Sequence, residues 1–367
     1  MGWYFAFIGL VCIQCFLLYP QGRMTLKSKV ATRHNRNFLI LVCVELIFFA
    51  GLRNPTIGAD TGVYLRALNY YAALPKGEIL GAKLVYPFDF EVGYFLLTKI
   101  CALIGMNETQ FLLLIAAIIY VPLFRFLYKY SENPMLSFAI WIAFGFFGYS
   151  LGIFRQMIAL SITLCGFSYI RERRMIRYLL IVALASTFHW SALITIPLYF
   201  FYWIDIKKIF KWVLVAEVVA FIGARSILLF VLRFVPQYAG YINGQYDLQG
   251  SGNTMLIILN FVLIVGYYIY CKVKVETQNS VMRIYISALM IASILQAMGH
   301  AMEIFGRSVL YYSIYMILLI PICVNRYFRP QSRVWVNVLV FILLMVIFYI
   351  LHVGNEMLCP YQFVWQR

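Results

Sequence analysis

Charged residues are scarce in this chain of 367 residues. They make up 12% of it, whereas an ordinary soluble domain carries about 25%. Hydrophobic residues account for 63%, and the mean hydropathy is +0.84. A soluble protein of this size has no interior large enough to hide that much apolar surface, so lipid must be the solvent for most of it. The composition excludes a soluble enzyme and predicts an all-α polytopic membrane protein.

Several kinds of sequence motif are missing as well. The chain has no glycine-rich phosphate-binding loop, no cysteine or histidine spacing typical of a metal site and no soluble nucleotide-binding domain. We therefore expect neither a cofactor nor a metal, and the sequence argues against a nucleotide-sugar enzyme or an ATP-driven transporter. The net charge of +16 would suggest nucleic acid in a soluble chain. In a membrane protein it first raises the question of which side the cations occupy, and we expect no nucleic-acid partner.

Apolar runs that could cross the lipid bilayer recur along the whole chain. A spanning helix needs roughly 20 mainly apolar residues, or fewer where neighbours or bilayer thinning help. Twelve runs qualify, near 3–19, 37–52, 109–128, 135–151, 154–170, 176–188, 190–204, 211–232, 254–271, 282–302, 307–324 and 334–352.

Segment 90–105 is ambiguous, because it is short and carries Glu91 and Lys99. If it lies in the membrane interface, 20 of the 30 basic residues fall on one side of the membrane, as the positive-inside rule requires. If it spans, the asymmetry largely cancels. We therefore predict an interfacial helix here, about twelve transmembrane helices in a single domain over 1–367, and both termini in the periplasm. Periplasmic loop regions are predicted at 53–108 and 233–253.

Three arginines are expected at outer helix ends: Arg53, Arg155 and Arg307. Arg155 is the only charged residue between Met135 and Ile170. Each arginine could simply extend its cation from a helix end toward water. Ionisable residues within a membrane, however, usually face a cavity or a partner. Guanidinium groups bind phosphate oxygens through two hydrogen bonds, so the three together suit a phosphate-bearing ligand with a lipid tail, such as a glycan on a polyprenyl diphosphate.

Candidate acid–base groups lie in the same outer regions. His189 is predicted at the apex of a hairpin of two short helices, and Glu303 stands four residues before Arg307. Asp60 and Glu91 supply further carboxylates. A histidine buried for structural reasons and an i,i+4 ion pair at a helix end are the simpler alternatives for His189 and Glu303.

Five short motifs occur in order along the chain. They are Arg53 with Asp60-Thr and Tyr64, Glu91-Val-Gly-Tyr-Phe95, Phe154-Arg155-Gln156-Met-Ile-Ala159, Phe188-His189-Trp-Ser-Ala192, and Arg307-Ser-Val-Leu-Tyr311. Their order resembles that in the EpsG/Wzy group of bacterial exopolysaccharide and O-antigen polymerases. One departure is Trp190, where the family usually has proline.

The resemblance implies an enzyme related to the C-type membrane glycosyltransferases, located in the bacterial inner membrane. Such a polymerase transfers a growing glycan from its undecaprenyl diphosphate carrier onto another lipid-linked repeat unit at the periplasmic face. A chain-length regulator and a flippase are the protein partners it would imply. The candidate roles are diphosphate binding by Arg53, Arg155 and Arg307, catalysis by His189, Asp60 or Glu303 without a metal, and glycan binding by Glu91, Tyr64 and Gln156.

Two other functions would use the same carrier. A flippase would share the basic cytoplasmic loops and the buried arginines, but transporters commonly have two related halves, and no convincing internal repeat is present. An O-antigen ligase would use the same donor. A membrane scaffold without activity would not need cations at Arg155 and Arg307.

Overall fold

A computed structural model describes residues 1–18, 29–79, 81–82, 88–233, 253–272, 276–299, 303–353, 355 and 357–366. Helices dominate these residues, and the only β-type pairing described in them is an isolated bridge between Arg53 and Phe363. The all-helical class predicted from the sequence is confirmed.

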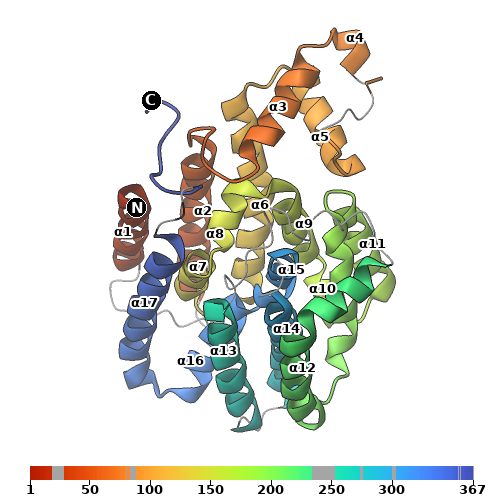
Figure 1. Ribbon diagram of the computed structural model, residues 1–367. Coiled ribbons are helices and arrows are strands. Elements are labelled where there is room, and N and C mark those ends of the chain that lie inside the picture. The colour runs from red at the N-terminus through yellow and green to blue at the C-terminus, as the bar shows by residue number, and fades with distance from the viewer. Residues whose placement is uncertain are drawn as a thin grey trace. The chain divides into compact units, whose positions relative to one another are not determined.

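Figure 1 shows the helices, which are labelled in chain order. In chain order they are α1 (Gly2–Leu18), α2 (Lys29–Gly51), α3 (Thr61–Ala72), α4 (Lys76–Ile79), α5 (Val92–Leu103), α6 (Glu108–Tyr130), α7 (Pro134–Ala143), α8 (Phe146–Gly152), α9 (Phe154–Cys165), α10 (Phe167–Arg171), α11 (Met175–Ser186), the 3₁₀ helix η1 (Trp190–Tyr202), α12 (Ile206–Leu232), α13 (Asn253–Lys272), α14 (Glu276–Gly299), α15 (Glu303–Ser313), α16 (Met316–Tyr327) and α17 (Pro330–His352).

All twelve predicted apolar runs coincide with helices or helix pairs, and the ambiguous segment 90–105 contains α5. Among the described residues, five helices are long and apolar enough to cross a membrane: α2, α6, α13, α14 and α17. Two bent pairs raise the number to seven if each is one span, namely α7 with α8, bent by 61°, and α15 with α16, bent by 43°. The protein is therefore a membrane protein by length and composition. A total of twelve spans and a likeness to C-type glycosyltransferases stay predictions.

The chain divides into two compact units. The first comprises Met1–Tyr169, Ile176–Leu193 and Phe328–Arg367, and the second comprises Ile170–Met175 and Ile194–Tyr327. The predicted single domain and the periplasmic placement of 53–108 stay predictions. Nearly all of the predicted loop 233–253 lies outside the described residues.

In the first unit, α6 is the central helix. It begins with a capping box, in which the Asn107 side chain accepts from the Gln110 backbone N–H and the Gln110 side chain accepts from that of Asn107. It packs against α2 on one side and α9 on another, and α3 packs against α5. Tyr120 of α6 is fully buried and is hydrogen-bonded to Ser150 of α8 at 2.8 Å. These contacts fix the start of α9, which carries Arg155.

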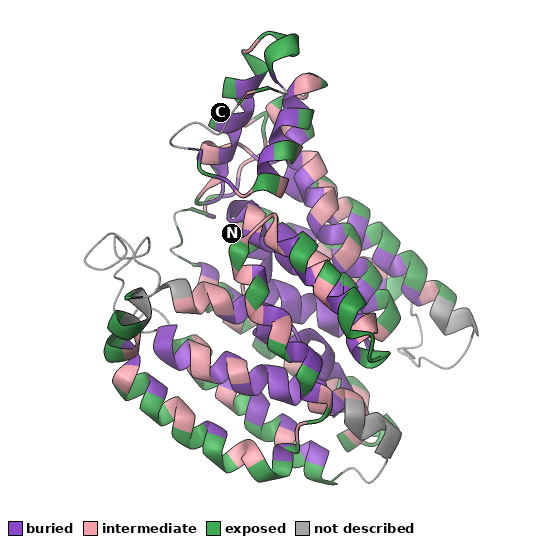
Figure 2. Ribbon diagram, turned by 90° about the vertical axis from the view of Figure 1, so that its right-hand side faces the viewer, coloured by how far each residue is buried: buried purple, intermediate pink, exposed green. Residues whose placement is uncertain are grey.

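In the second unit, α14 is the central helix, and α12, α13, α15 and α16 pack around it. The Asn260 amide donates to Glu217 and so links α13 to α12. Figure 2 shows exposed residues along the helices of both units. Many of the exposed residues are large and apolar, among them Ile222, Trp335 and Leu339. Apolar exposure of this extent is costly in water and is expected for surfaces that face lipid.

Candidate functional site

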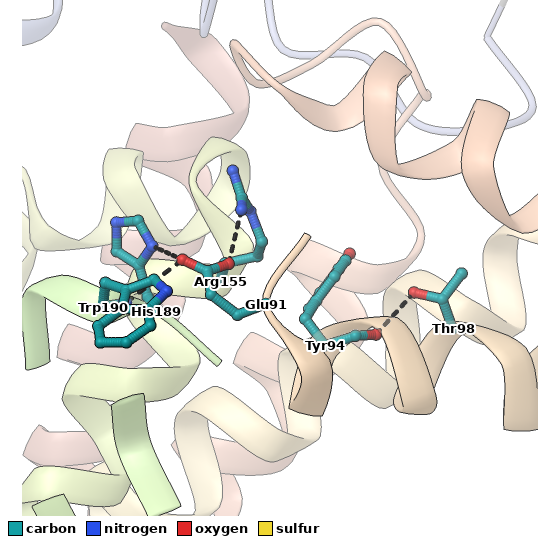
Figure 3. Close-up of polar contacts among 6 residues, drawn as sticks. All are labelled: Glu91, Tyr94, Thr98, Arg155, His189 and Trp190. Atoms are coloured by element: carbon teal, nitrogen blue, oxygen red, sulfur yellow. Dashed lines mark hydrogen bonds and ion pairs between the residues drawn. The ribbon is translucent and has the colours of Figure 1, made fainter. Parts of the chain in front are cut away.

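Glu91 is the centre of a partly buried ionic cluster in the first unit (Figure 3). Its side chain is 9% exposed, and one carboxylate oxygen, Oε2, lies 2.6 Å from Nη1 of Arg155. The other oxygen, Oε1, lies 2.7 Å from Nδ1 of His189 and accepts from the backbone N–H of Trp190 at 3.3 Å. We call Glu91, Arg155, His189 and the Trp190 backbone the Glu91 site.

Three separate parts of the chain supply this site. Glu91 immediately precedes α5, Arg155 is in the first turn of α9, and His189 lies in the connection between α11 and η1. The backbone N–H of Gly93 donates to the carbonyl of Thr187 at 2.7 Å, so the start of α5 lies against the end of α11. A Cβ at position 93 would be 2.5 Å from Thr187 Oγ1 and 2.8 Å from the Thr187 carbonyl oxygen. This close approach therefore requires glycine, and it holds Glu91 beside His189.

Burial, hydrogen bonding and charge set the protonation state of Glu91. Burial disfavours the charged carboxylate, but the hydrogen bond with His189 and the positive charge of Arg155 outweigh it and lower the pKa of Glu91 to about 2. Glu91 is thus ionised at neutral pH, and an ionised carboxylate only accepts hydrogen bonds.

Arg155 is held by aromatic residues as well as by Glu91. Its guanidinium lies over the ring of Phe90, with the centroid 5.1 Å away, and interacts with the Tyr64 hydroxyl. Tyr64 is buried and stacks on Phe154 at 4.7 Å. Burial is the main reason that the pKa of Tyr64 rises to about 12, so this phenol stays neutral. The Arg155 side chain nevertheless remains 25% exposed, which leaves a cation accessible at the site.

Arg53 lies in a different environment from Arg155. It is only 2% exposed, and its guanidinium donates to three carbonyls, those of Ala50, Ile57 and Leu151. The adjacent backbone pairs with the C-terminal segment, since Asn54 N–H donates to the Gln362 carbonyl at 2.8 Å. The contacts of Arg53 are therefore those of a residue that joins segments of the backbone.

The other predicted site residues are spread over both units. Asp60 lies at the N-terminus of α3 and is half-buried, and Gln156 is buried in α9. Arg307 is half-buried in α15 of the second unit. Glu303 begins the same helix, and its side chain is outside the described residues. No group of three or more His, Cys, Asp or Glu that could hold a metal occurs in the described part of the chain.

Comparison with known families gives one result. The model of the EpsG family matches residues 36–363, which is most of the chain. This chain belongs to the EpsG family. The family comprises polysaccharide polymerases, and membership indicates a polymerase of the glycosyltransferase type. No curated protein and no solved structure matches the chain significantly.

In this EpsG-family protein, the structure brings together three residues that the sequence singled out separately: Glu91, Arg155 and His189. Sequence reasoning missed the contribution of Trp190, whose backbone N–H donates to Glu91 and whose side chain is 64% exposed. Its position directly after His189, where the family usually has proline, was the one available signal.

Proposed function

We propose that this EpsG-family protein transfers a growing glycan from undecaprenyl diphosphate onto another lipid-linked repeat unit at the periplasmic face of the bacterial inner membrane. Family membership supports the polymerase class. The observation that supports the finer statement is the Glu91 site, where an accessible cation and an accessible imidazole share one carboxylate. The basic connections between helices are expected on the cytoplasmic side of the membrane. The Glu91 site is then expected on the periplasmic side.

The proposed reaction is a displacement at the anomeric carbon of the donor sugar. The acceptor hydroxyl oxygen forms the new bond to this carbon, and the bond from carbon to the diphosphate oxygen breaks. The electron pair of the broken bond leaves with the diphosphate, and the hydroxyl proton passes to a base of the protein. Catalysis then requires a cation near the departing diphosphate and a base near the acceptor.

Arg155 and His189 suit these two roles. Arg155 keeps a quarter of its side chain exposed although it is paired with Glu91, so it can contact a diphosphate oxygen. The His189 side chain is 29% exposed beside it and can take the proton from the acceptor hydroxyl. Neither role requires a metal. We propose that Arg53 supports the backbone around the start of α9, because its donors are occupied by carbonyls.

The remaining assignments extend the same proposal. Arg307 is a second candidate for diphosphate binding, and Asp60 and Glu303 are alternative acid–base groups. Tyr64 and Gln156 are candidates for the glycan side of the site. We propose that the site belongs to a domain of twelve transmembrane helices with periplasmic termini. A flippase would supply the lipid-linked repeat units, and a chain-length regulator would act with the protein.

The glycan ladder of a deletion strain tests the proposed function. A polymerase predicts that long chains disappear while one capped repeat unit remains on the surface. Loss of all surface repeat units would indicate a flippase or a ligase instead. An unchanged ladder would exclude all three functions.

A further inference from the structure

The Glu91 carboxylate is surrounded by hydrogen-bond donors. Oε2 accepts from Arg155, and Oε1 accepts from the Trp190 backbone and contacts Nδ1 of His189. A carboxylate with its oxygens engaged in this way is poorly placed to bind sugar hydroxyls, in contrast to the glycan-binding role predicted from the sequence. Its contacts are instead those of a group that orients its neighbours.

The contact with Glu91 determines which nitrogen of a neutral His189 ring carries the proton. An ionised carboxylate can only accept, so the 2.7 Å contact requires the proton of a neutral imidazole to be on Nδ1. The second ring nitrogen, Nε2, then carries the free electron pair. The same arrangement, a carboxylate that holds Nδ1–H and leaves Nε2 as the base, orients the histidine in serine proteases.

We infer that Glu91 is a positioning residue, which fixes the tautomer and orientation of His189 so that Nε2 accepts the proton of the attacking sugar hydroxyl. This inference rests on the proposed function. Arg155 keeps Glu91 ionised and in place, while the Trp190 N–H fixes the second lone pair on Oε1. The proton moves from the acceptor hydroxyl to Nε2 and remains on the imidazolium, which the Glu91 anion stabilises.

Glu91→Gln is the sharpest variant, because it keeps the shape of the side chain. All three partners of Glu91 are donors, and the amide has only one oxygen. If this oxygen faces Arg155, the amide NH₂ faces Nδ1 and forces the proton onto Nε2, so the base is lost. If it faces His189, the NH₂ points at the guanidinium. The rate of chain extension is expected to fall by about 10²- to 10⁴-fold, the range that general base catalysis supplies.

The test measures the rate of chain extension in membranes that contain wild type, Glu91→Gln, His189→Ala or the double variant at equal protein amounts. Glu91→Gln should lower the rate in the wild-type background and change it little in the His189→Ala background. A residue that merely supports the fold would lower the rate in both. Glu78→Gln is the matched control, since Glu78 is exposed in α4, and it should leave the rate unchanged.

A conservative variant provides a second test of the inference. Glu91→Asp keeps the charge and should retain more activity than Glu91→Gln.

The outcomes separate the inference from the proposed function. If wild type extends chains and Glu91→Gln extends them equally fast, or the two variants lower the rate independently, Glu91 does not act through His189. If Glu91→Asp extends chains no faster than Glu91→Gln, the inference is also wrong. If the wild-type protein extends no chains from lipid-linked repeat units, the proposed function itself is wrong.

Discussion

Gly93→Ala disturbs the Glu91 site without replacing any of its side chains. The new Cβ would lie 2.8 Å from the Thr187 carbonyl oxygen, whereas ordinary contacts begin at 3.4 Å. The start of α5 and the end of α11 must therefore separate by about 0.6 Å. The overpacking costs about 1–3 kcal/mol, and weakening the 2.7 Å bond between Gly93 and Thr187 adds about 0.5–1.5 kcal/mol.

The same displacement reaches Glu91 and His189, because each is two residues from the contact. It would stretch the 2.7 Å separation between Glu91 Oε1 and His189 Nδ1 beyond the about 3.2 Å limit of a good hydrogen bond. Misplacement by about 1 Å can cost about 100-fold in rate. We therefore expect Gly93→Ala to slow chain extension by about 10- to 100-fold.

The assay compares the lengths and rates of glycan synthesis in membranes with equal amounts of folded protein. Gly77→Ala is the matched control, since a Cβ at this exposed position in α4 meets nothing within 4 Å. A folded Gly93→Ala protein that extends chains at the wild-type rate would refute the argument that this close approach positions the site.

Three other predictions concern charge. Arg53→Ala should lower the free energy of unfolding by several kcal/mol, at about 1–3 kcal/mol for each carbonyl left unsatisfied. Thermal unfolding in detergent measures this loss. Unchanged stability would contradict the proposal that Arg53 supports the backbone around the start of α9. The pKa of Glu91 is about 2 in the folded protein and about 4.3 when unfolded, so its stabilising effect is complete above about pH 5 and is lost as the pH falls toward 2. The difference in melting temperature between wild type and Glu91→Gln should narrow over that range, and a constant difference would be evidence against ionised Glu91. Arg155→Ala should abolish long glycan chains at an unchanged protein level. A normal glycan ladder would show that Arg155 is not needed to bind the diphosphate.

The sequence predicted the helical membrane class and the positions of most helices, because apolar runs are a local property of the chain. It did not predict that α7 and α8 are separate helices. The 135–151 run is continuously apolar, and the break at Gly145, where φ is 81°, is visible only in the backbone. The 3₁₀ conformation of η1 likewise has no clear signal in its apolar sequence.

The sequence singled out Glu91, Arg155 and His189 as candidates, but it did not predict which of them pair with one another. Arg53 and Arg155 look alike in sequence, since both are arginines at predicted helix ends. Their difference arises from contacts with distant segments: Arg53 bonds to the Leu151 carbonyl, and Arg155 pairs with Glu91, 64 residues away. The contact between Glu91 and His189 spans 98 residues, so only the folded chain brings these two side chains together.

Reconstitution of the purified protein in liposomes with one lipid-linked repeat unit as substrate tests the proposed polymerase reaction. Products of two and more repeat units should form, with one undecaprenyl diphosphate released for each new glycosidic bond and without an added nucleotide. Repeat units that remain single, or that only cross the bilayer unchanged, would contradict it.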